Sequence, residues 1–188
     1  MRFADYCCTL GVKIIGTETG TVVGDLREYR KNLTEENYER CKDVLFPVIK
    51  YANERGVCAG IETVSYYPVC TTERFQRFVS DLSGCDICSI FDPTNLLNAD
   101  NYLNQHALID AFVRDNAKKI KVVHLKDFVL ENGVTADVPL FGGGLDVRFV
   151  LEKLNEYGVD SDLVVENSRS IKQFKEIADR LRNIMKEI

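Results

Sequence analysis

The chain has 188 residues, of which 45% are hydrophobic and 28% are charged, and its formal net charge is −5 at pH 7. This composition predicts one globular domain over residues 1–188 and excludes a disordered chain. The acidic balance argues against a nucleic-acid partner. The sequence contains neither an apolar run near the roughly 20 residues that span a membrane nor the pattern of a signal peptide, so we expect a cytoplasmic protein.

Five short apolar segments predict buried strands. Each is mostly apolar and lacks the alternation of polar and apolar residues, which is typical of strands buried on both faces of a parallel sheet. In chain order they are residues 12–16, 58–63, 86–91, 120–125 and 162–166.

Apolar residues at steps of three and four positions predict helices between and after these strands. The helices are expected near residues 38–52, 75–82, 103–112, 149–157 and 171–185. Thr34 and Gly56 are expected to cap the first helix, and Pro47 to kink it. Strand and helix therefore alternate, which indicates a parallel α/β domain. Residues 129–145 are expected to form an irregular loop over one end of the sheet.

The seven cysteines favour a reducing compartment over a disulfide scaffold, because their number is odd and most have apolar neighbours. We expect them to pack as small hydrophobic side chains. Cys85 and Cys88 have the spacing of a zinc knuckle, but the sequence has no second such pair and no histidine pair beside them.

Acidic side chains and a histidine occur where the predicted strands end. Four consecutive strands end in Glu62, Asp92, His124 and Glu166, and Glu18 follows the first strand. In parallel α/β proteins, ligands bind at the carboxyl ends of the strands. Three carboxylates at one edge repel one another unless a cation lies between them. Oxygen and nitrogen ligands of this kind suit Mn²⁺, Mg²⁺, Co²⁺ or Zn²⁺.

Each of these residues also has an ordinary structural explanation. An acidic residue after a strand often caps a helix, and a lone histidine in a strand is often a satisfied core residue. The occurrence at four consecutive strand ends is what favours a metal site. The second histidine, His106, lies on a helical face and is interpreted as a surface or packing residue. The sequence lacks the established phosphate-binding glycine motifs and the nucleophile elbow, and residues 142–144 are interpreted as a flexible turn.

Ordered segments of the chain resemble the sugar phosphate isomerase/epimerase group of the xylose-isomerase-like barrel superfamily. These segments are GTETGT, GIETV, FDPTNLL, VVHLKDF and LVVEN, within about residues 12–168. The resemblance implies a (β/α)₈ barrel of the TIM type that acts on a small-molecule sugar or polyol and in which two glutamates, Glu62 and Glu166, exchange a proton. It implies one divalent ion, commonly Mn²⁺, held by Glu62, Asp92, His124 and Glu166. It also implies that Lys126 and Asp127 line the substrate pocket, and we expect Glu18 and Asn95 to bind the substrate as well.

Two departures from the family pattern bear on this interpretation. Epimerases of the group often have a histidine three residues after the aspartate ligand, where this chain has Asn95. The chain is also short for a barrel that typically needs about 250 residues. Its strands match the last five of the family barrel, so we expect an incomplete barrel that lacks the first three β/α units. A second copy of the chain, in a homo-oligomer, or a complementary N-terminal fragment is expected to cover the bare edge.

Three functions follow from these observations. The first is a metal-dependent sugar or sugar-phosphate isomerase or epimerase. The second is a truncated, catalytically inactive barrel or one subunit of a split barrel, because a closed pocket is what positions a substrate and excludes water. The third is a nuclease of the endonuclease IV type, against which the presence of only two histidines and the negative net charge argue.

Overall fold

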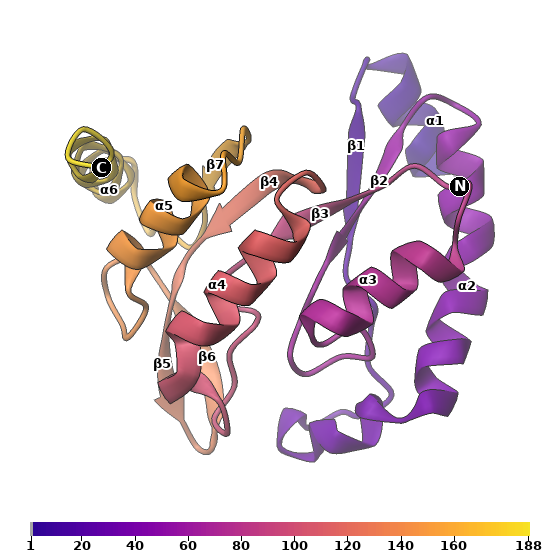
Figure 1. The fold of residues 1–188 in the computed structure, drawn as a ribbon, viewed down its shortest axis with the longest axis horizontal. Helices are drawn as coiled ribbons and strands as arrows, with labels where there is room; N and C mark the ends of the chain where they lie inside the picture. The colour runs from indigo at the N-terminus through magenta and orange to yellow at the C-terminus, as the bar shows by residue number, and fades with distance from the viewer. Residues whose placement is uncertain (1) are drawn as a thin grey trace. The chain divides into compact units, whose positions relative to one another are not determined.

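A computed structural model of the chain describes residues 2–188 (Figure 1). The backbone forms two compact units: unit 1 ends at Ile90 and unit 2 begins at Phe91. The expectation of a single domain stays a prediction. In chain order, the helices (α, with η for 3₁₀ turns) and strands are α1 (Arg2–Thr9), β1 (Ile14–Thr17), η1 (Leu26–Leu33), α2 (Glu35–Asn53), β2 (Cys58–Glu62), α3 (Thr72–Asp81), β3 (Ile87–Phe91), η2 (Tyr102–Asn104), α4 (Gln105–Asn116), β4 (Ile120–Leu125), β5 (Asp127–Glu131), β6 (Val134–Val138), α5 (Val147–Glu156), β7 (Asp162–Val165) and α6 (Ile171–Met185).

Unit 1 contains a parallel sheet in which β1 pairs with β2 and β2 pairs with β3. Figure 1 shows α2 running alongside these strands. Two glycines let the sheet pack tightly against Ile90 of β3. A Cβ atom on Gly16 would lie 2.6 Å from Ile90 Cδ1, and one on Gly60 would lie 2.9 Å from the same atom. A side chain at either position would require the Ile90 side chain to shift.

The predicted helices form, and the first turn of α2 is capped as the sequence indicates. Thr34 precedes α2, and its hydroxyl accepts the N–H of Asn37. Gly56 follows α2 with a φ of +70°, the left-handed conformation that favours glycine. Pro47 lies inside α2, and the helix continues through it.

Unit 2 contains the parallel pair β4 and β7, and Figure 1 shows α4 beside α5 and α5 beside α6. It also contains an antiparallel hairpin of β5 and β6. The expectation of an irregular loop over residues 129–145 is therefore wrong for its first half. Asn132 and Gly133 connect the two strands with φ values of +52° and +81°, which is the geometry of a two-residue hairpin turn.

All seven cysteines are free thiols. Cys7, Cys41 and Cys88 are buried, which confirms the expected packing, and burial raises the pKa of the Cys41 thiol to about 11. The expectation is wrong for Cys8, which is exposed on α1.

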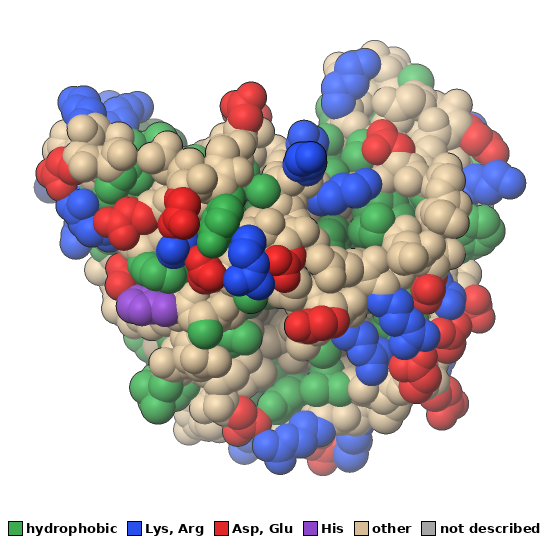
Figure 2. Space-filling view, viewed as in Figure 1, with side chains coloured by type: hydrophobic (Ala, Val, Ile, Leu, Met, Phe, Trp, Pro, Cys, Tyr) green, Lys and Arg blue, Asp and Glu red, His purple; other side chains and the backbone are tan. Residues whose placement is uncertain are grey.

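Large apolar side chains remain exposed in unit 1. They are Phe3, Tyr6, Leu10, Val12, Val22, Val44, Phe46 and Val48. On the face drawn in Figure 2, acidic and basic side chains are interspersed and apolar side chains reach the surface between them. Among residues 2–188, no helix combines the length and the hydrophobicity that crossing a membrane requires.

Candidate metal centre

Four polar side chains of unit 2 lie close together near the ends of strands. Asp92 follows β3, Lys126 follows β4 and Glu166 follows β7. His124 is the last residue but one of β4 and lies opposite Val164 of β7. The pairing continues past the strands, because the N–H of Glu166 donates to the carbonyl oxygen of Leu125 at 3.0 Å. The backbone register thus places these side chains together.

Asp92 is the most deeply buried member of this group, with a side chain that is 0% exposed. Its Oδ1 accepts the N–H of Thr94 at 2.8 Å and that of Asn95 at 3.3 Å. These two hydrogen bonds form a turn that fixes the orientation of the Asp92 carboxylate. Aspartate side chains commonly accept a hydrogen bond from the backbone N–H two residues later in the chain. The Thr94 hydroxyl also donates to the carbonyl oxygen of Lys126 at 3.0 Å, which ties the Asp92 turn to the residue that follows β4.

His124 and Glu166 lie next to each other beside Asp92. The Nδ1 atom of His124 is 3.3 Å from Oε1 of Glu166. Asp92 and His124 each offer a ligand atom, and these atoms lie within 4.8 Å of one another. Carboxylate oxygens and an imidazole nitrogen at this spacing can share one ion.

Lys126 supplies the positive charge among these carboxylates. Its Nζ lies 3.1 Å from Oδ2 of Asp92, 3.1 Å from Oδ2 of Asp137 and 3.7 Å from Oε2 of Glu166. The Lys126 side chain is only 9% exposed. Burial alone lowers the pKa of the ammonium, but Asp92 and Asp137 outweigh burial and hold the pKa above its ordinary value. The ammonium therefore stays charged.

The residues present fit a divalent ion. Two carboxylates and an imidazole are the hard and borderline donors that Mn²⁺, Mg²⁺ and Zn²⁺ bind. The Lys126 ammonium supplies the positive charge that these buried carboxylates need, and a divalent ion would supply the same kind of charge. Asp92, His124 and Glu166 could hold the ion.

Glu62, the remaining predicted ligand, lies in unit 1. It is the last residue of β2, is 8% exposed and lies opposite Ile90 of β3. Asp92 comes two residues after Ile90. Glu62 as a metal ligand stays a prediction.

Asp127 has a different environment from these residues. Its Oδ1 accepts the N–H groups of Phe128 and Leu145, both at 2.8 Å, and its Oδ2 accepts the N–H of Gly143 at 2.9 Å. The side chain is 1% exposed. The glycine segment interpreted as a flexible turn is therefore tied to Asp127 by hydrogen bonds.

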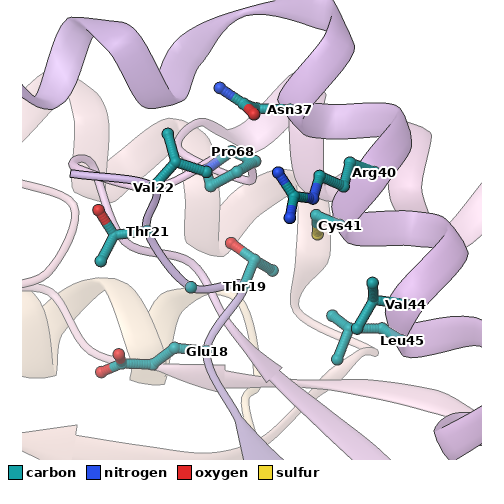
Figure 3. A pocket seen from close by; sticks show the side chains of 11 residues that line it. Glu18, Thr19, Thr21, Val22, Asn37, Arg40, Cys41, Val44, Leu45 and Pro68 are labelled. Carbon is teal, nitrogen blue, oxygen red and sulfur yellow. The ribbon is translucent and has the colours of Figure 1, made fainter.

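The last two predicted pocket residues lie in different units. Asn95 is half-buried in unit 2, directly after the Asp92 turn. Glu18 lines a cavity of about 310 Å³ within unit 1, between the segment that follows β1 and helix α2 (Figure 3). In Figure 3, Arg40 of α2 lies across this cavity from Thr21, and the Glu18 carboxylate points away from Arg40.

Sequence reasoning missed Asp137. It lies on β6, in a segment that we expected to be irregular, and it shares the Lys126 ammonium with Asp92. The signal for the hairpin was present as Asn132-Gly133 followed by an alternating strand. His106 matches its interpretation as a surface and packing residue, because it stacks on Phe149 and its side chain is 57% exposed.

Comparisons with known proteins identify the family and the fold of the chain. The model of the family described as "xylose isomerase-like TIM barrel" matches residues 1–185. No curated protein matches the chain. A xylose isomerase domain protein from Planctomyces limnophilus is 19% identical with a TM-score of 0.73, and the match covers 98% of this chain and 62% of that one. A D-tagatose 3-epimerase-like protein is 19% identical with a TM-score of 0.74, and the match covers 98% and 67%.

A third similar structure is a xylose isomerase-like TIM barrel protein from Mycobacterium smegmatis in complex with magnesium. It is 14% identical with a TM-score of 0.65, and the match covers 98% of this chain and 64% of that one. The chain thus spans 62% to 67% of the length of these three structures. Their similarity confirms the predicted fold, an incomplete parallel barrel of the TIM type.

Proposed function

Because the chain belongs to the family of xylose isomerase-like TIM barrels, we propose that it is a divalent-metal-dependent sugar or sugar-phosphate isomerase or epimerase. The observation that carries the proposal is the buried group of Asp92, His124 and Glu166 around the Lys126 ammonium. Two similar structures support it, since one is described as epimerase-like and another was solved with magnesium.

The proposed ligands are Glu62, Asp92, His124 and Glu166. For Asp92, His124 and Glu166, the support is their proximity in unit 2. For Glu62, it is the strand register, which sets Glu62 opposite Ile90 just before Asp92. Mn²⁺ is the proposed ion, and Mg²⁺, Co²⁺ and Zn²⁺ suit the same donors.

Two glutamates are proposed to move the proton. A divalent ion bound here would polarise the carbonyl group of a sugar and make the neighbouring C–H more acidic. A Glu62 or Glu166 carboxylate oxygen would then take the proton from that carbon, and the other glutamate would return one. For Glu166, the neighbouring His124 Nδ1 and Lys126 Nζ orient the carboxylate.

The remaining polar residues are proposed to hold the substrate or shape its pocket. Lys126 would bind a sugar oxygen through its ammonium, and Asn95 through its amide. Asp127 would shape the pocket by holding the 142–144 segment in place. It would not bind the substrate directly, because both of its carboxylate oxygens already accept backbone N–H groups. Glu18 would contribute from the end of β1.

Calorimetry with Mn²⁺ tests the proposed ligands. We expect one saturable site in the wild-type chain and an affinity loss of at least about 100-fold in Asp92→Asn and in His124→Ala, because each removes a ligand. His106→Ala is the matched control, since it removes the other histidine from an exposed position, and it should bind as the wild type does. Equal binding by wild type and Asp92→Asn would contradict the proposal.

Turnover is tested separately on a panel of ketoses and ketose phosphates. Glu166→Gln keeps the shape of the side chain but removes the base, so we expect kcat to fall at least about 100-fold. Metal binding without turnover of any of these sugars would instead favour a catalytically inactive barrel, the alternative that the 62% coverage of a relative leaves open.

A further inference from the structure

Lys126 is shared between a proposed metal ligand and a carboxylate that belongs to the hairpin. Its Nζ lies 3.1 Å from Asp92 and 3.1 Å from Asp137. The Asp92 side chain is 0% exposed, whereas the Asp137 side chain is 46% exposed. One partner of the ammonium is therefore deep in the site, and the other lies at its solvent-exposed side.

A divalent ion at this site creates a conflict with the ammonium. An ion bound by Asp92 and Glu166 would bind the carboxylates that Lys126 now contacts at 3.1 and 3.7 Å. Two cations this close repel strongly in a partly buried site. A buried ammonium is also costly to leave without a carboxylate partner. The ammonium therefore needs a partner that does not bind the ion.

We propose that Asp137 is a positioning residue, which holds the Lys126 ammonium when a divalent ion binds Asp92 and Glu166. The inference rests on the proposed function, because it assumes the metal site described above. Asp137 holds the ammonium at the exposed side of the site, where a sugar oxygen can meet it. The hairpin is thus part of the metal site, although it contributes no ligand.

The hairpin geometry suits this role. β5 begins at Asp127, directly after Lys126, and Asp127 lies opposite Val138. Asp137 lies opposite Phe128, one position from the base of the hairpin. Lys126 Nζ already contacts Asp137 at 3.1 Å, so the ammonium can keep this partner when an ion takes Asp92.

Calorimetric Mn²⁺ titrations of single and double variants test the inference. We expect Asp137→Asn to weaken Mn²⁺ binding about tenfold, because the displaced ammonium then lacks a carboxylate partner. In a Lys126→Met background no ammonium has to be displaced, so the same change should alter affinity by no more than about twofold. Asp137→Glu keeps a carboxylate and should retain most of the affinity. Lys126→Gln serves as the background if Lys126→Met does not fold by circular dichroism.

Glu131→Gln is the matched control. It removes the same charge from the turn end of the same hairpin, where Glu131 is exposed and lies opposite Val134. Its Mn²⁺ affinity should equal that of the wild type. If Asp137→Asn binds Mn²⁺ as the wild type does, or if it loses equal affinity in both backgrounds, the inference is overturned. The proposed function is then unaffected. A wild-type chain that binds no Mn²⁺ would overturn the proposed function as well.

Discussion

Lys126 contacts three carboxylates of the site through one ammonium group. Removing an ammonium from water costs several kcal/mol unless carboxylates surround it. Here Asp92, Asp137 and Glu166 all lie within 4 Å of its Nζ. The sequence showed Lys126 beside a strand end, but it could not show that a residue 11 positions later would share the ammonium.

Asp127 is a second buried charge, and its partners are backbone N–H groups. Asparagine at this position has one acceptor oxygen instead of two, and its amide N–H group would face a backbone N–H group, which is also a donor. We expect Asp127→Asn to lower the free energy of unfolding by about 2–3 kcal/mol, because hydrogen bonds to charged groups are the stronger kind. Urea denaturation measures this change through the midpoint at constant slope.

The control for this substitution is Asp160→Asn. Asp160 is exposed between α5 and β7, and exposed substitutions of this kind usually change stability by less than about 0.5 kcal/mol. Equal midpoints for Asp127→Asn and the wild type would show that the hydrogen bonds to Phe128, Gly143 and Leu145 contribute no net stability.

At the scale of elements, the segment after the hairpin depends on a glycine. A Cβ atom on Gly143 would lie 2.0 Å from the carbonyl oxygen of Phe128 and 2.6 Å from Oδ1 of Asp127. Because backbone would have to move, we expect Gly143→Ala to destabilise the chain by about 1–3 kcal/mol. Thermal unfolding followed by circular dichroism measures the effect.

Gly144→Ala is the matched control in the neighbouring position. Its Cβ atom would meet no atom closer than 3.5 Å, the Cζ of Phe128, which is an ordinary contact. We expect its melting temperature to stay close to that of the wild type. If Gly143→Ala melts as Gly144→Ala does, the segment is free to shift and Asp127 does not fix it.

The strands and main helices could be predicted because each carries a local signal. The strand predicted at 120–125 matches β4 at both ends, since a buried strand is a short apolar run between polar ends. The hairpin was missed because β5 and β6 are partly exposed and lack such a run. The Asn132-Gly133 turn was the available signal.

The candidate site was predictable only in part. The topology of parallel strands brings Asp92, Lys126 and Glu166 to one edge, and this follows from where the strands end. The contacts between side chains do not follow from it. Asp127 is adjacent to Lys126 in the chain, but its carboxylate binds backbone N–H groups instead of the cation, and Asp137 takes the cation from a strand that the apolar pattern did not reveal.

At the scale of the whole molecule, the exposed apolar side chains of unit 1 form a surface that another molecule could cover. Ala4 and Cys7 of α1 pack inward on Ala52 and Val57, whereas other apolar residues of α1 and its flank face solvent. These are Phe3, Tyr6 and Leu10, which are 66%, 64% and 78% exposed. In the same unit, β1 pairs with β2 on one side, and no strand within residues 2–188 pairs with its other side. Such an edge and such an apolar face favour association.

We expect the 188-residue chain to associate with a second copy through this face, since the same surface on two copies can cover itself about a two-fold axis. Light scattering at micromolar concentration should give a mass near twice 21.4 kDa. The double variant Tyr6→Glu with Leu10→Glu should shift the mass toward the monomer, because four charges at a two-fold contact repel. Leu103→Glu, at an 85% exposed apolar residue of unit 2, is the control and should leave the mass unchanged.

A wild-type chain that is monomeric and unfolds cooperatively would contradict the expectation. Binding of an added N-terminal β/α fragment to that monomer would then identify the alternative partner.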